Sequence, residues 1–120
     1  MTDRSDRRKH TRTDVRLPAA MRPAGGGEAL SVTTLNIGAG GVYVEVPHFI
    51  EPLTKLEIGL DLPGAPARLE TEAIVVRTQP EQESPGVDRY QVACAFLGLT
   101  DEHRALLHKW VADRGVAARS

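Results

Sequence analysis

Strict alternation of apolar and polar residues runs through the middle of the chain and predicts β-strands. The clearest case is residues 55–62, in which every second position is a leucine or an isoleucine. Residues 41–46 alternate in the same way, with valines on one side and Tyr43 and Glu45 on the other. A period of two places alternate side chains on opposite faces of a sheet, so each segment should have one buried face. Weaker versions of the pattern predict strands at residues 15–21, 28–35, 67–78 and 89–96.

The hydrophobic period changes after residue 100 and predicts one C-terminal helix. Its apolar face consists of Leu106, Leu107, Trp110 and Val111. Thr100 is a suitable N-cap, and Gly115 could adopt the left-handed conformation that ends a helix. Six short strands with glycine- and proline-rich turns, then one helix, predict an all-β fold. We expect a six-stranded antiparallel β-barrel with the helix over one open end and Trp110 as its plug.

The charge of the chain is unevenly distributed. Residues 1–22 contain seven basic and three acidic residues, whereas the whole chain has a net charge of −1, which leaves −5 for the remainder. The first dozen or so residues lack hydrophobic periodicity and are predicted to be flexible. We therefore expect a flexible basic arm at residues 1–14, a barrel with its closing helix at residues 15–114, and a tail at residues 115–120. A basic arm on an acidic body suggests an anionic partner; a tail that only adds solubility, or folds back onto the body, is the alternative.

Two segments have a composition that folding alone does not require. The first is Arg7-Arg8-Lys9-His10-Thr11-Arg12, whose guanidinium groups could bind phosphate or the O6 and N7 edge of guanine through paired hydrogen bonds. The second is residues 36–41, predicted to form a tight turn. Three glycines there let the backbone approach a ligand closely, and the Asn36 amide supplies both a donor and an acceptor.

Other chemistry finds little support in the sequence. The four histidines lack the spacing of metal ligands, Cys94 falls at an inward strand position, and no nucleophile elbow or phosphate-binding loop occurs. We therefore expect a non-enzymatic protein without a metal or cofactor. A single cysteine, no apolar run long enough to span a membrane and no secretory leader favour a cytoplasmic protein without membrane insertion.

The order of the two segments within a barrel-plus-helix pattern resembles the PilZ domains of bacteria. Their motifs are RxxxR in an N-terminal arm and [D/N]xSxxG at a later strand turn. Arg8-Lys9-His10-Thr11-Arg12 fits the first motif completely, and residues 36–41 fit the second at Asn36 and Gly41 but carry Gly38 in place of the serine. The resemblance extends over about residues 7 to 114.

This resemblance implies a receptor for the second messenger cyclic di-GMP, which signals by ordering its arm and engaging a protein partner. The implied ligand-binding residues are Arg7, Arg8, Arg12, Asn36, Gly38 and Gly41. Because Gly38 lacks a hydroxyl, it should weaken the site by about 0.5–1.5 kcal/mol. A degenerate PilZ adaptor that binds only a protein partner is the alternative. Nucleic-acid binding is disfavoured, because aromatic residues make up only 4% of the chain and Tyr43 is its one outward aromatic on a strand.

Overall fold

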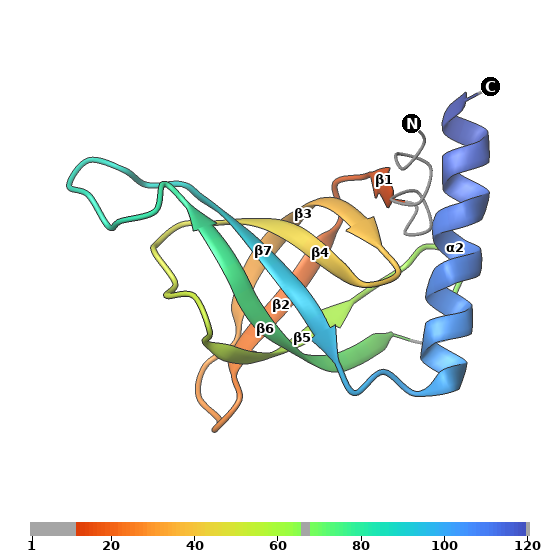
Figure 1. Ribbon diagram of the computed structural model, residues 1–120, viewed down its shortest axis with the longest axis horizontal. Helices are drawn as coiled ribbons and strands as arrows, with labels where there is room; N and C mark the ends of the chain where they lie inside the picture. Colours follow the sequence, from red (N-terminus) through yellow and green to blue (C-terminus); the bar gives the residue numbers. More distant parts are fainter. Residues whose placement is uncertain (1–11, 66–67, 120) are drawn as a thin grey trace, which may run out of the picture.

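The computed structural model describes residues 12–65 and 68–119, and within these it gives the side chains of residues 13–65 and 68–113. The elements are β1 (Arg12–Asp14), β2 (Pro18–Pro23), β3 (Leu30–Gly38), β4 (Gly41–Val46), β5 (Lys55–Leu60), β6 (Leu69–Gln79), β7 (Tyr90–Leu97) and α2 (Asp101–Arg119), as drawn in Figure 1.

Six antiparallel strands close the predicted barrel, in the order β3, β2, β5, β6, β7 and β4, and the pairing of β3 with β4 completes the ring. The seventh strand of the described chain, β1, was not predicted. It lies along the same edge of β3 as β2: β2 pairs with residues 30–33 of β3, and β1 pairs with residues 36–38. Residues 12–14, predicted to belong to the flexible arm, thus form part of the sheet.

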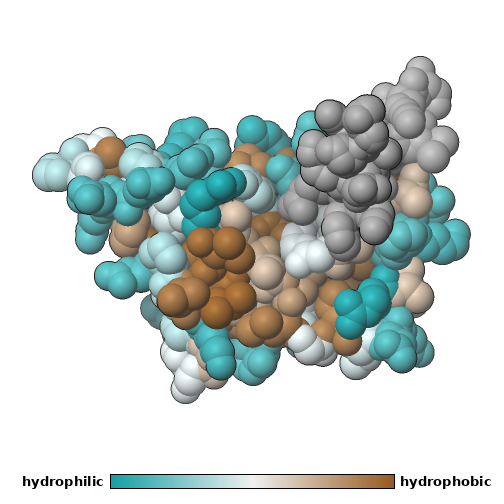
Figure 2. Space-filling model, in the orientation of Figure 1, coloured by the Kyte–Doolittle hydropathy of each residue, from teal (hydrophilic) through white to brown (hydrophobic). Residues whose placement is uncertain are grey.

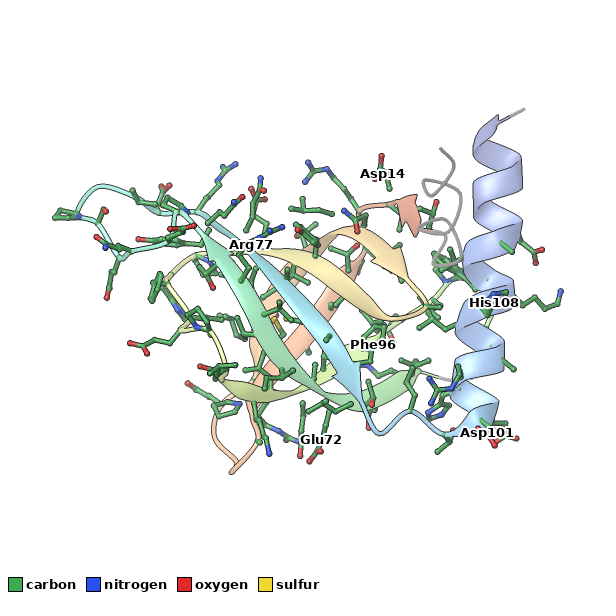
Figure 3. The ribbon with its side chains drawn as sticks, viewed as in Figure 1. Asp14, Glu72, Arg77, Phe96, Asp101 and His108 are labelled. Carbon is green, nitrogen blue, oxygen red and sulfur yellow. The ribbon has the colours of Figure 1, made fainter. Side chains whose placement is uncertain are left out.

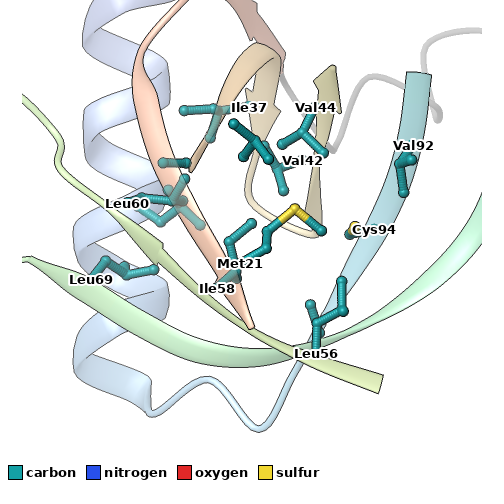
Figure 4. Packing of buried hydrophobic residues seen from close by; sticks show 14 of the residues in the cluster. Met21, Ile37, Val42, Val44, Leu56, Ile58, Leu60, Leu69, Val92 and Cys94 are labelled. Carbon is teal, nitrogen blue, oxygen red and sulfur yellow. The ribbon is translucent and has the colours of Figure 1, made fainter. Parts of the chain in front are cut away.

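The predicted alternation fills the barrel with aliphatic side chains (Figure 4). The valines of β4 (Val42, Val44 and Val46) are at most 1% exposed, and Leu56, Ile58 and Leu60 of β5 are at most 4% exposed. Burying a side chain of this size contributes about 1.5–3 kcal/mol. The core therefore lies inside the ring of strands, and the outward positions of the same strands remain available for binding.

Helix α2 begins where the sequence predicts and lies at one end of the barrel, packed on β1 and β3 (Figure 1). The Thr100 hydroxyl caps it by accepting a hydrogen bond from the His103 backbone N–H at 3.0 Å. The Trp110 indole N–H donates to the Pro63 carbonyl oxygen at 3.0 Å, which ties the helix to the loop after β5. The helix continues to Arg119, so Gly115 lies inside it and the segment expected as a tail is mostly helical. No helix in the described part of the chain is both long and apolar enough to cross a membrane.

Candidate ligand-binding site

The end of the basic arm lies directly beside the second predicted motif. In the register of β1 with β3, Arg12 pairs with Gly38 and Asp14 pairs with Asn36. Arg7 and Arg8 lie outside the described residues, and for Arg12 the structure gives the backbone. The pairing nonetheless brings the last residue of the RxxxR motif next to the glycine that replaces the motif serine.

Buried Thr34 fastens the chain where it passes from β1 to β2. Its hydroxyl accepts a hydrogen bond from the Leu17 N–H at 2.8 Å and donates one to the Val15 carbonyl oxygen at 2.5 Å. Thr34 is completely buried, and backbone hydrogen bonds join Val15 to Leu35 and Thr34 to Leu17. These bonds fix the segment between β1 and β2 against β3.

The turn between the two motif strands is shorter than predicted. Asn36, Ile37 and Gly38 belong to β3, and only Ala39 and Gly40 connect β3 to β4. Ile37 is completely buried in the core, which holds this end of β3 in an extended conformation. The Gly40 carbonyl oxygen accepts a hydrogen bond from the Phe96 N–H at 3.0 Å, so the hairpin tip is also tied to β7. The hairpin is therefore a firm support for a ligand.

Gly41 is required by the barrel itself. A Cβ atom at this position would overlap the carbonyl oxygen of Cys94 on β7, the strand that pairs with β4. Its φ does not fall in the left-handed region. The absence of a side chain at Gly41 thus has a packing reason within the barrel.

A β-bulge places Asn36 on the outside of the barrel. Thr34 pairs with Val44 and Asn36 pairs with Tyr43, so Leu35 is the extra residue. Without the bulge, the alternation that buries Val32 and Thr34 would bury Asn36 as well. The half-buried Asn36 amide instead lies on the outer surface between Asp14 and Tyr43, its cross-strand neighbours.

Two observations describe the chemistry near this site. Burial raises the pKa of the Cys94 thiol to about 12, so it stays protonated and unreactive near neutral pH. In the described ranges, no group of three histidine, cysteine or carboxylate side chains could hold a metal ion. The available chemistry is that of hydrogen-bond donors and acceptors beside a basic arm.

Comparison with known proteins identifies the family. The sequence matches the PilZ domain over residues 6–113, which includes both motifs and α2 as far as Asp113. The chain belongs to the PilZ domain family. No curated protein matches the sequence.

Several solved PilZ structures share this fold. The Bacillus subtilis inhibitor of motility has a TM-score of 0.78 and 22% identity, over 94% of this chain and 53% of that one. MrkH from K. pneumonia, in its c-di-GMP complex, has a TM-score of 0.72 and 17% identity over 93% of this chain and 54% of its own. The PilZ domain of Escherichia coli YcgR with c-di-GMP has a TM-score of 0.69 and 12% identity, over 94% and 95% of the two chains. The chain thus spans about half the length of the first two proteins and nearly all of the isolated PilZ domain.

The structure also shows an interaction near this PilZ motif that the sequence analysis missed. Arg77 on β6 donates a hydrogen bond to the Tyr43 hydroxyl and lies over the Tyr43 ring, with its guanidinium carbon 5.9 Å from the ring centroid. Tyr43 is the cross-strand partner of Asn36. The two residues are 34 positions apart in the sequence, and no local motif links them.

Proposed function

We propose that this PilZ domain is a non-enzymatic receptor that binds cyclic di-GMP between its basic arm and the β3–β4 hairpin. The ligand-binding residues are Arg7, Arg8, Arg12, Asn36, Gly38 and Gly41. The observation that carries the proposal is the direct pairing of Arg12 with Gly38, because it brings the two motifs to one edge of the barrel. MrkH and the YcgR PilZ domain, which share the fold, are both described with c-di-GMP bound.

The two halves of the proposed site have complementary chemistry. Guanidinium groups of the arm bind phosphates and guanine edges through paired, charge-assisted hydrogen bonds. The hairpin supplies the Asn36 amide and the backbone near Gly38. Arg8 and Arg12 carry the largest share of the affinity, because their contacts involve charge on both partners.

Ligand binding would then act as a signal. The bound nucleotide holds the arm against β1 and the hairpin, and the surface formed in this way is what a protein partner recognises. Since β1 and β3 also support α2, the partner surface can include that helix. The location proposed for this function is the cytoplasm, where a nucleotide second messenger is present.

Titration calorimetry with cyclic di-GMP tests this function. We expect the wild-type protein to bind and the Arg8→Ala and Arg12→Ala variants to bind roughly 10- to 150-fold more weakly, as expected for loss of one charged hydrogen-bonding group. Arg22→Ala is the matched control, because Arg22 lies on β2 and pairs with Glu57. No heat from wild-type protein at high ligand concentration would favour an adaptor that binds protein alone. Salt-sensitive binding to a random oligonucleotide would favour a nucleic-acid-binding barrel.

A further inference from the structure

A row of directly paired residues crosses the outer surface of the barrel from the candidate site toward β6. Asp14 pairs with Asn36, Asn36 with Tyr43, Tyr43 with Ala93, and Ala93 with Arg77. All five are exposed or half-buried, so their side chains share one outer face. Figure 3 shows Asp14 and Arg77 on the upper side of the barrel, whereas Glu72 lies on its lower side.

Two separate β-bulges build this row. Leu35 is the extra residue that turns Asn36 outward, and Val76 is the extra residue that does the same for Arg77. After each bulge the next side chain returns to the core: Ile37 is completely buried and Thr78 is 1% exposed. Bulges re-aim side chains and are enriched beside functional sites. Here they bring two hydrogen-bonding side chains to opposite sides of Tyr43.

Arg77 extends toward the candidate site across its neighbouring strand. The small side chain of Ala93 separates it from Tyr43 in the row, which leaves room for the arginine to cross β7. Two strand spacings amount to roughly 10 Å, a distance that Arg77 and Tyr43 bridge together when they meet above β7. The guanidinium lies over the aromatic ring and bonds to its hydroxyl, and this contact fixes its orientation.

The positive charge of Arg77 has no counterion in the described part of the chain. No carboxylate with a described side chain lies within 4.0 Å of it. The other barrel arginines with described side chains each pair with a carboxylate: Arg16 and Arg89 with Glu45, Arg22 with Glu57, and Arg68 with Asp61. A guanidinium has five N–H donors, so the bond to Tyr43 leaves others available for a ligand.

We propose that Arg77 is a further arginine of the nucleotide site and reads a guanine base of the ligand, with Tyr43 as its positioning residue. This inference rests on the proposed cyclic di-GMP binding. Guanine presents two acceptors, O6 and N7, that match the parallel N–H groups of a guanidinium. Adenine presents an amino donor in place of O6 and cannot accept the same pair of hydrogen bonds. Arg77 is thereby a specificity-determining residue.

Calorimetric titration of wild-type and Arg77→Ala protein with cyclic di-GMP and, separately, with cyclic di-AMP tests the assignment. We expect the wild type to prefer cyclic di-GMP. Arg77→Ala should weaken cyclic di-GMP binding by roughly tenfold to a hundredfold, as for loss of one bidentate base contact, and should leave cyclic di-AMP binding nearly unchanged. An equal loss for both ligands would mean a phosphate contact and overturn the guanine assignment, as would unchanged affinity for cyclic di-GMP.

Two further variants separate the role of Tyr43 from folding. Tyr43→Phe keeps the ring but removes the oxygen that orients Arg77, so it should reduce the preference for cyclic di-GMP several-fold without changing cyclic di-AMP affinity. An unchanged preference would remove Tyr43 from the proposal. Arg89→Ala is the control, because its arginine pairs with Glu45, and it should bind like wild type. If the wild type binds neither nucleotide, the proposed function fails and this inference fails with it. If the wild type binds cyclic di-GMP and Arg77→Ala binds it equally well, this inference fails but the proposed function stands.

Discussion

Both polar faces of the barrel carry arginines paired with carboxylates, but one face also carries an arginine, Arg77, without such a partner among the described side chains. On the face formed by β2, β5 and β6, Arg22 lies 2.5 Å from the Glu57 carboxylate and Arg68 lies 3.4 Å from that of Asp61. On the face formed by β1, β3 and β4, Glu45 holds Arg16 and Arg89, whereas Arg77 reaches in from β6 to an aromatic ring without a carboxylate partner among the described side chains. An arginine that already holds a carboxylate must release it before it can hold a phosphate, so among the barrel arginines with described side chains Arg77 is the one prepared for an anionic ligand.

The position of a surface cavity favours the other polar face, formed by β2, β5 and β6. A cavity of about 380 Å³ lies on the β2–β5–β6 face, and its charged lining residues are Arg22, Glu57, Arg68, Glu70 and Glu72. Carboxylates outnumber arginines there, so the cavity would repel a phosphorylated nucleotide. The presence of a cavity would thus favour a different face from that of the proposed site, which is chosen on the charges of its side chains.

Hydrophobic residues also gather on the surface away from the motifs. Figure 2 shows them over β6 and β7, and among the described residues Val76 is 58% exposed and Leu53 is 76% exposed. Val76 is the extra residue of the β6 bulge. The same bulge that turns Arg77 outward therefore also exposes an apolar side chain beside it.

The largest expected difference between the two faces concerns stability and involves two glycines. A Cβ at Gly41 meets the backbone of β7, whereas a Cβ at Gly59 on β5 meets the Arg68 side chain, whose Nε would be 2.9 Å away. A long side chain can move but a paired backbone cannot, so Gly41→Ala should destabilise the fold by about 3 kcal/mol and Gly59→Ala by less than about 1 kcal/mol. Urea unfolding measures both values.

An equal loss of stability in Gly41→Ala and Gly59→Ala would show that β4 and β7 can separate as easily as Arg68 can move.

The Gly41→Ala variant also serves as a control in binding studies. A Gly41→Ala protein that no longer binds nucleotide would report a disturbed barrel, and its loss of affinity should not be counted as a lost ligand contact.

A smaller effect is expected inside the hairpin. Gly38 lies in extended β3, where serine fits the backbone, and its hydroxyl could donate a hydrogen bond to the ligand. Gly38→Ser should tighten cyclic di-GMP binding by about 0.5–1.5 kcal/mol, which is roughly two- to twelvefold, in a calorimetric titration. Gly40→Ser is the matched control, since Gly40 is exposed and a Cβ added there would meet no atom within 4 Å, and it should bind like wild type. Unchanged or weaker binding by Gly38→Ser would contradict this account of the motif.

The smallest effect is expected on the β2–β5–β6 face. Glu57→Gln removes the carboxylate that holds Arg22 and makes the cavity less acidic. Because the pair is exposed to solvent, thermal stability should change little, and nucleotide affinity should stay at the wild-type value. Appreciably tighter nucleotide binding by this variant, measured by the same titration, would place the ligand in the cavity and reverse the comparison of the two faces.

Local sequence patterns predicted much of the fold because hydrophobic periodicity and helix capping depend on residues that are close together in the sequence. The alternation in residues 41–46 matched β4, that in residues 55–62 matched β5 as far as Leu60, and the Thr100 cap fixed the start of α2. Cys94 was expected in the core and is 4% exposed. The motif residues Arg12, Asn36, Gly38 and Gly41 were also found from sequence, and the register places them around one hairpin.

The outward position of Arg77 depends on where a β-bulge interrupts the alternation of buried and exposed residues in β6. Continued from Leu69, Ala73 and Val75, the pattern would put Arg77 inside the barrel, but the bulge at Val76 reverses the remaining positions. Only the pairing of β6 with β7 shows this reversal. For the same reason the sequence could not connect Arg77 with Tyr43, since each faces outward without any local sign of the other.

By itself, the sequence determined which residues alternate and where the helix begins, and it supplied two short motifs as candidates for binding. These properties follow from backbone periodicity, capping and side-chain type, which act within a few residues. The tertiary structure decided the strand β1, the two bulges, the packing reason for Gly41 and the arginine that lies over Tyr43. Each of these depends on which strand lies next to which and in what register, and pairing over long sequence separations is set by the closing of the whole barrel.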